Sequence, residues 1–171
     1  MPRYVAFLRG VTPANLRMAD LRLAAEESGF TGVRTLLSSG NVAFDASSRT
    51  EAAVSRALEA AIAARAGRPF RAFVRRQADL AALVAADPFA PFPLPEGAKR
   101  VVTFLPAPPD PPPALPLDQD GVRILALCGR EVLTAYVPHP RGPVFMTLLE
   151  RLVGTEATTR TWDTVRKCAE A

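Results

Sequence analysis

Hydrophobic and polar residues follow one another in the first half of the chain in a pattern that predicts six elements. Short apolar runs bounded by glycine or polar residues predict strands, and apolar residues three or four apart predict helices. The predicted strands are residues 4–8, 32–37, 42–44 and 70–75, and the predicted helices are residues 18–28 and a helix that follows a capping box at residues 48–51 and ends at Gly67. This order of elements is that of the split βαβ, or ferredoxin-like, unit.

Six further elements are predicted in the rest of the chain. The pattern predicts strands at residues 101–105, 122–127 and 131–137 and helices at residues 79–86, 144–153 and 161–169. The fold class is therefore α+β. A ferredoxin-like βαββαβ N-terminal half, residues 1–87, is followed by a smaller α+β C-terminal half, residues 88–171, with a three-strand antiparallel sheet.

Proline is concentrated where the two predicted halves meet. Of the 17 prolines, 11 lie between Pro88 and Pro116, on both sides of the strand at 101–105. Proline has no backbone N–H and a fixed φ, so these segments are predicted to be stiff, extended polyproline II connectors. The alternative is that the proline-rich loop docks on an aromatic groove of a partner.

Composition excludes several classes of protein. The two cysteines, Cys128 and Cys168, and the single histidine, His139, are too few for a structural zinc site, so no metal and no cofactor is predicted. No apolar run reaches the length of a membrane span, and the amino terminus does not resemble a signal peptide, so a cytoplasmic location is expected. The net charge of +4 comes from scattered arginines, which permits weak attraction of anions.

Two turns in the first half carry residue types that suit an anionic ligand. Arg9 and Gly10 end the first strand, where a guanidinium is a forked donor for carboxylate or phosphate and a glycine allows close approach to the backbone. Ser39, Gly40 and Asn41 form the hairpin turn, where successive N–H groups can bind an anion. A simpler structural interpretation exists for both: a strand-end arginine paired with an acid, and a tight turn that requires these residues for its geometry.

The turn predicted before the last helix is the strongest candidate site. Thr158, Thr159, Arg160 and Trp162 lie at the start of that helix, and a helix N-terminus beside an arginine suits an anion. Trp162 could stack on a ligand. The competing interpretation is structural, because a threonine can cap the helix and Trp162 can anchor it to the core. Both interpretations stay open.

Several segments together resemble the domain-of-unknown-function family 1697, which comprises small bacterial proteins. The matching motifs are Arg9-Gly10, Ser39-Gly40-Asn41 and Thr158-Thr159-Arg160. The chain departs from the family pattern at Thr161 and Asp163, where the family usually has asparagines. The resemblance implies an α+β fold with a ferredoxin-like amino half. It implies no reaction, because the activity of the family is unassigned.

These observations favour a ligand-binding or regulatory module for an anionic small molecule, with Arg9, Asn41 and Arg160 converging on it. Nucleic-acid binding is an alternative, because the RNA-recognition fold shares the ferredoxin-like topology and the sequence pI is about 9.7. The paired aromatic residues of RNA-binding strands are missing, however. An enzyme of unassigned reaction is a further alternative, with His139 or Asp163 as acid or base, although no partner lies at a motif spacing. The oligomeric state is not indicated.

Overall fold

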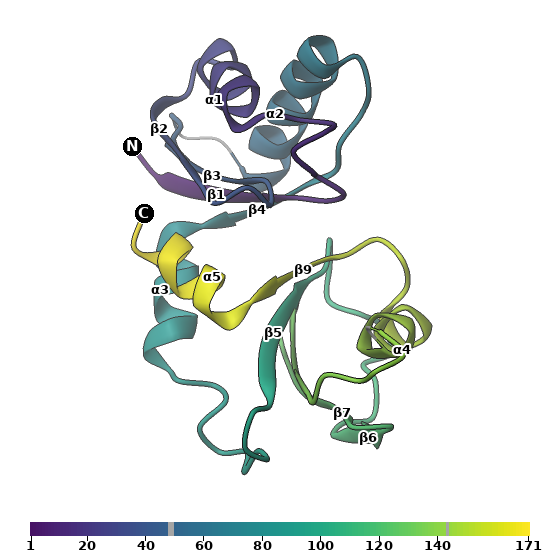
Figure 1. Ribbon diagram of the computed structural model, residues 1–171. Helices are drawn as coiled ribbons and strands as arrows, with labels where there is room; N and C mark the ends of the chain where they lie inside the picture. The colour runs from purple at the N-terminus through teal and green to yellow at the C-terminus, as the bar shows by residue number, and fades with distance from the viewer. Residues whose placement is uncertain (48–49, 143) are drawn as a thin grey trace. The chain divides into compact units, whose positions relative to one another are not determined.

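The computed structural model comprises two compact units joined along the chain (Figure 1). The structure describes residues 1–47, 50–142 and 144–171. The first unit consists of Met1–Ala86 with Val165–Ala171, and the second of Asp87–Thr164. The last seven residues therefore belong with the first unit, whereas a division of the sequence at residue 87 places them in the second.

The first unit contains a four-stranded sheet with two long helices on one of its faces (Figure 1). Its elements are β1 (Arg3–Leu8), α1 (Met18–Glu27), β2 (Thr31–Leu36), β3 (Asn41–Asp45), α2 (Glu51–Ala66), β4 (Ala72–Arg76), α3 (Gln77–Ala85) and the last residues of α5 (Trp162–Ala169). The strand order is β2-β3-β1-β4, and all neighbouring strands are antiparallel. Each helical connection leaves one strand between the strands that it joins, which is consistent with the predicted split βαβ arrangement.

The core of the first unit lies between the sheet and its two long helices. Alternate residues of the strands, including Tyr4 and Phe44, face Leu21 of α1 and Leu58 of α2. The rings of Phe30 and Phe44 stack with their centroids 4.4 Å apart. Phe30 directly follows Gly29 at the end of α1, so the chain returns onto the core at this point.

Both ends of α2 are formed by residues that satisfy the helix backbone. Thr50 caps the N-terminus, because its Oγ1 accepts a hydrogen bond from Ala53 N–H at 3.2 Å. Ser48 of the predicted capping box lies outside the described residues. Gly67 ends the helix with a φ of +73°, in the left-handed region that glycine adopts without strain.

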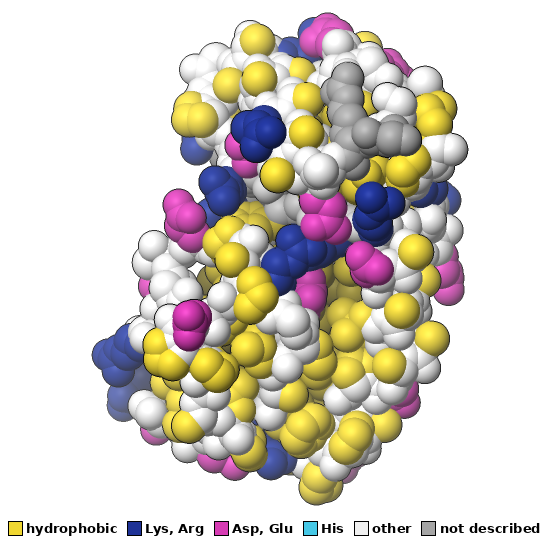
Figure 2. Space-filling view, turned by 180° about the vertical axis from the view of Figure 1, so that it is seen from behind, with side chains coloured by type: hydrophobic (Ala, Val, Ile, Leu, Met, Phe, Trp, Pro, Cys, Tyr) yellow, Lys and Arg dark blue, Asp and Glu magenta, His cyan; other side chains and the backbone are white. Residues whose placement is uncertain are grey.

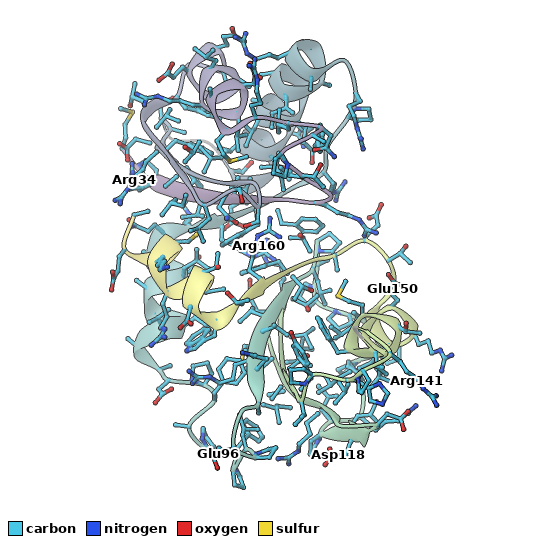
Figure 3. All side chains as sticks on the ribbon, viewed as in Figure 1. Arg34, Glu96, Asp118, Arg141, Glu150 and Arg160 are labelled. Atoms are coloured by element: carbon cyan, nitrogen blue, oxygen red, sulfur yellow. The ribbon has the colours of Figure 1, made fainter. Side chains whose placement is uncertain are left out.

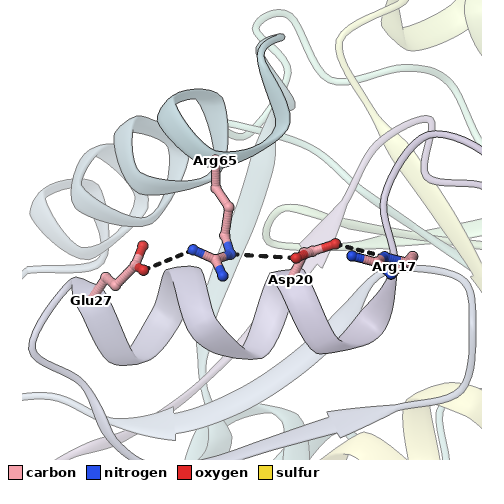
Figure 4. A network of polar contacts seen from close by, with 4 residues as sticks. All are labelled: Arg17, Asp20, Glu27 and Arg65. Carbon is pink, nitrogen blue, oxygen red and sulfur yellow. Dashed lines mark hydrogen bonds and ion pairs between the residues drawn. The ribbon is translucent and has the colours of Figure 1, made fainter.

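A network of ion pairs joins α1 to α2 on the surface of the first unit (Figure 4). Arg65 of α2 lies 3.4 Å from an Asp20 carboxylate oxygen and 2.8 Å from one of Glu27. Arg17 lies 2.9 Å from the other carboxylate oxygen of Asp20. Because these side chains are partly exposed, the network adds little stability to the contact between the two helices.

The second unit has a five-stranded antiparallel sheet, not the three-strand sheet that the sequence predicts. Its elements are β5 (Lys99–Phe104), β6 (Leu117–Gln119), β7 (Val122–Cys128), β8 (Glu131–Tyr136), α4 (Val144–Val153), β9 (Thr158–Thr161) and the start of α5. The strand order is β6-β7-β8-β5-β9. The two additional strands, β6 and β9, have three and four residues, too few to show a clear alternation.

Helix α4 covers one face of this sheet. Phe145 and Leu149 of α4 belong to a buried cluster with Val101, Ile124 and Val132. Residues 106–116, which contain seven prolines, form neither helix nor strand, as predicted. Within the described residues, no helix is both long and apolar enough to pass through a membrane.

Candidate functional site

The fold brings the first two predicted motifs together at one end of the first sheet. The N–H of Leu8, the last residue of β1, donates to the carbonyl oxygen of Gly40 at 2.8 Å. Arg9 and Gly10 directly follow Leu8, so this segment starts beside the turn that joins β2 to β3. Gly40 is buried with a φ of +84°, and a Cβ there would lie 2.9 Å from the Val11 side chain. Glycine is thus required at this position both by its φ and by packing.

Asn41 holds the turn together from inside. Its side chain is fully buried. Its Nδ2 donates to the carbonyl oxygen of Leu36 and to Oγ of Ser39, both at 2.9 Å. These bonds span the four turn residues, of which Leu37 has a φ of +59°. The amide of Asn41 therefore acts on the turn itself, which fits the structural interpretation of this residue.

Arg9 and Gly10 lie at the surface, at the start of an ordered loop. Asn15 fixes this loop, because its Nδ2 donates to Gly10 O and its Oδ1 accepts from Thr12 N–H, both at 2.8 Å. Gly10 has a φ of +73°, and apart from its two neighbours in the chain no described residue has an atom within 4 Å of the position of a Cβ. Asn15 is not among the site residues that the sequence predicts. Its position could have indicated this role, because Asn15 lies three residues after Thr12 and an asparagine side chain at this spacing can close a turn.

The third predicted motif is a strand in the second unit and not the predicted capping turn. Arg160 of β9 is buried, and its Nη1 donates to Thr158 Oγ1 at 2.8 Å and to Thr159 O at 3.0 Å (Figure 3). The hydroxyls of Thr159 and Thr103 lie 2.8 Å apart across the β5–β9 ladder. Threonine is β-branched and favours strands, which explains why this segment pairs with β5.

Trp162 anchors the start of α5 to the core. Its side chain is buried, and its ring meets that of Phe89 edge-on, with the centroids 5.1 Å apart. The threonine that caps this helix is Thr161, whose Oγ1 accepts from Thr164 N–H at 3.3 Å. Both contacts fit the structural interpretation of this motif.

The candidate residues therefore form two clusters, one in each unit. We call Arg9, Gly10, Ser39, Gly40 and Asn41 the first-unit cluster, and Thr158, Thr159, Arg160 and Trp162 the second-unit cluster. The predicted convergence of Arg9, Asn41 and Arg160 on one ligand remains a prediction.

Cys128 and His139 are the next residues of the sequence analysis to be placed. Burial, together with the charge of Glu131, raises the pKa of the Cys128 thiol, which keeps it protonated at neutral pH and lowers its reactivity. His139 is exposed, and its Nδ1 accepts from Arg141 N–H at 3.1 Å. Among the described residues, no group of three or more histidine, cysteine or acidic side chains is placed to hold a metal ion.

Sequence reasoning missed two buried polar side chains. Arg75 of β4 is buried, and its Nη1 donates to Val74 O at 3.0 Å. Thr134 of β8 is also buried, and its hydroxyl has no partner among the described residues. In a strand whose hydrophobic and polar residues alternate, a polar residue is interpreted as facing solvent. The sequence therefore did not indicate that either residue is buried.

The two units define an α+β protein with two antiparallel sheets. The family described as "Protein of unknown function (DUF1697)" matches residues 1–131, and the chain belongs to this family. The match includes the first-unit cluster and ends before the second-unit cluster.

A solved structure shares this fold along nearly the whole chain. The conserved bacterial protein SP0830 from Streptococcus pneumoniae superimposes with a TM-score of 0.71, over 99% of this chain and 97% of that chain. The two sequences are 18% identical, so the likeness concerns the fold alone. No curated protein matches the sequence.

Proposed function

We propose that this protein is a binding module for an anionic small molecule, and that the first-unit cluster is its binding site. The observation that carries the proposal is the exposed Arg9 at the start of a loop that Asn15 holds in place. A guanidinium donates two parallel hydrogen bonds to a carboxylate or phosphate, and a fixed loop reduces the entropy lost on binding.

The neighbouring residues support this assignment by their placement. Gly10 leaves open space over its backbone, which suits close approach of a ligand. Ser39 is exposed, and its Oγ accepts from buried Asn41, so the hydroxyl is held at the surface of the turn. Asn41 and Gly40 would then support the site indirectly. They fix the conformation of the turn and do not contact the ligand.

A small anion is a better match than a nucleic acid. A nucleic-acid backbone requires a stripe or patch of basic side chains. On the face shown in Figure 2, arginine and lysine side chains are scattered among acidic and uncharged ones. A single exposed arginine beside an ordered loop suits one carboxylate or phosphate group.

Thermal denaturation with inorganic phosphate, citrate and a nucleoside monophosphate tests the proposal. A ligand present at a hundred times its dissociation constant stabilises the folded state by about 2.7 kcal/mol, which raises the midpoint of unfolding. Arg9→Ala is expected to abolish this shift, and the matched control Arg56→Ala, an exposed arginine of α2, is expected to keep it. No shift with any of the three compounds, or an equal shift in Arg9→Ala, contradicts the proposal.

A second variant, Arg160→Ala, tests the role of the second-unit cluster. If Arg160 contacts the ligand, this variant loses the shift as Arg9→Ala does. If Arg160 has only a structural role, the variant unfolds at a lower temperature but keeps the full shift.

A further inference from the structure

Strand β2 is an outer strand of the first sheet, and the hydrogen bonds determine which of its backbone groups face outward. Leu8 N–H donates to Gly40 O, so the backbone of Gly40 faces β1. In an antiparallel ladder successive residues face opposite neighbours, so the backbone of Asn41 faces β2, where it is paired with Leu36. The N–H and C=O of Thr35, one residue earlier, therefore point away from the sheet.

This outer edge is regular and uncovered over its last residues. The ladder between β2 and β3 shifts register between Thr31 and Arg34 and is regular from Arg34 to Leu36. Arg3 Nη2 donates to Gly32 O at 3.2 Å, before the regular part. Among the residues that the structure describes, no group bonds to the outward backbone of Thr35.

A groove with a volume of about 400 Å³ lies beside this edge. Its walls are Arg34, Thr35, Leu36 and Leu37 of the hairpin and Lys167 and Glu170 near the end of α5. Arg34 and Lys167 are exposed, and neither forms an ion pair in the described part of the chain; Figure 3 shows Arg34 at the outer side of the sheet. The groove therefore offers two positive charges, with Glu170 as the one negative charge among its described walls.

Leu37 adds an apolar contact at the end of the groove. Leu37 is half exposed, and its φ of +59° lies in the left-handed region, which leucine rarely adopts. A large apolar side chain held at the surface by a strained backbone conformation is typical of binding surfaces. It lies directly after the regular part of β2.

We propose that the outer edge of β2 docks an extended, acidic polypeptide segment of a partner protein, which adds as a further strand to the first sheet. The backbone of the segment bonds to the N–H and C=O of Thr35, as in β-strand addition. Its carboxylates lie against Arg34 and Lys167, and an apolar side chain packs on Leu37. This role is separate from the proposed anion site at Arg9 and does not depend on it.

Charge decides between a partner segment and a second copy of this chain. Pairing of β2 with β2 of another copy would bring two Arg34 and two Lys167 side chains to one short edge with only two Glu170 side chains, so positive charge would remain in excess there and would repel. The same two charges attract an acidic segment. Complementarity therefore favours a foreign acidic strand over self-association.

Fluorescence anisotropy with a labelled ten-residue peptide that alternates glutamate and valine tests this proposal. We expect saturable binding to the wild-type protein, and at least about tenfold weaker binding of a matched peptide that alternates lysine and valine. Thr35→Pro removes the outward N–H and keeps the pairing with β3, so it should weaken binding at least about tenfold. The control Thr35→Val keeps the N–H and should bind as the wild type does.

Arg34→Glu keeps the test decisive if Thr35→Pro does not fold. Arg34 is exposed, so the variant should unfold at the same temperature as the wild type. It should bind the acidic peptide more weakly and the lysine peptide more tightly than the wild type does. Equal binding of the acidic peptide to wild type and Thr35→Pro, with both folded by circular dichroism, overturns strand addition. So does the absence of saturable binding. A concentration-dependent dimer that Thr35→Pro abolishes would show instead that a second copy occupies the edge.

Discussion

The two edges of the first sheet differ in whether their outward-facing backbone groups have hydrogen-bond partners. At the β4 edge, Ala72 N–H donates to Glu59 Oε1 at 2.8 Å and Arg76 N–H donates to Glu51 Oε1 at 3.0 Å. Both glutamates belong to α2, so a helix of the same unit satisfies the outward N–H groups of Ala72 and Arg76. At the β2 edge, the backbone of Thr35 has no such partner among the described residues. An uncovered edge is a template for pairing with another chain, so the protein protects one edge and leaves the other available.

The protection of β4 depends on a match between helix rise and strand rise. Glu51 and Glu59 are eight residues apart, about 12 Å along a helix and slightly more than two turns, so they lie on the same side of α2. Ala72 and Arg76 are four residues apart, about 13 Å along a strand. Ser55, halfway between the glutamates, also donates to Ala72 O, at 2.9 Å. Helix α2 thus serves as a substitute for a neighbouring strand.

Native-state hydrogen exchange should show the largest difference between the two edges. The amides of Ala72 and Arg76 donate to carboxylates, whereas that of Thr35 faces outward, so we expect Thr35 to exchange on the order of a hundred times faster. The inward-facing amide of Arg34 is the control on the same strand and should be protected. Equal protection of Thr35 and Arg34 would mean that the β2 edge is covered.

Loss of the Asn41 side chain should give the largest change in stability. Strand β2 has one neighbouring strand, so the turn that Asn41 fixes is what holds it in register. Asn41→Ala leaves the half-buried carbonyl of Leu36 without this donor and should lower the free energy of unfolding by about 2–3 kcal/mol, measured by urea denaturation. Ser39→Ala removes an exposed acceptor of the same amide and should cost less than about 1 kcal/mol. Similar losses in the two variants would contradict this role of Asn41.

The first sheet could be predicted from the sequence because each of its elements carries its own signal. The strand at β1 is a continuous apolar run, and α2 ends at a glycine in the left-handed conformation. The strand β9 carries no such signal: four residues, three of them threonine, fit a cap and a strand equally well. Only the pairing with β5, more than fifty residues earlier, decides between them.

The candidate site was less predictable than the fold for the same physical reason. Arg9 and Asn41 were both expected at a ligand, but burial separates them: Arg9 is exposed, and Asn41 bonds within its turn. The type of a residue determines which hydrogen bonds it can form, whereas tertiary contacts determine where its partners lie. The protected edge of β4 was likewise not foreseen, because Glu51 and Glu59 look like ordinary solvent-facing residues of an amphipathic helix.

Removal of Glu59 should open the protected edge. Glu59→Ala leaves the mostly buried N–H of Ala72 without its charged acceptor, so we expect the free energy of unfolding to fall by about 2 kcal/mol and the Ala72 amide to exchange faster. Glu59→Gln keeps an acceptor oxygen at the same place and should lose less than half as much. Unchanged exchange at Ala72 in Glu59→Ala would show that the carboxylate does not protect this edge.

The smallest expected effect concerns the ion pairs between α1 and α2. Arg65→Ala removes the contacts with Asp20 and Glu27, and because these groups are partly exposed, we expect a loss of at most about 1 kcal/mol. Salt screens such pairs, so the difference from the wild type should shrink between low salt and about 1 M salt in urea denaturation. If α2 protects β4 through Glu51 and Glu59 alone, the Ala72 amide stays protected in Arg65→Ala. Faster exchange at Ala72 in this variant would mean that the protected edge depends on the position of the whole helix and not only on its two glutamates.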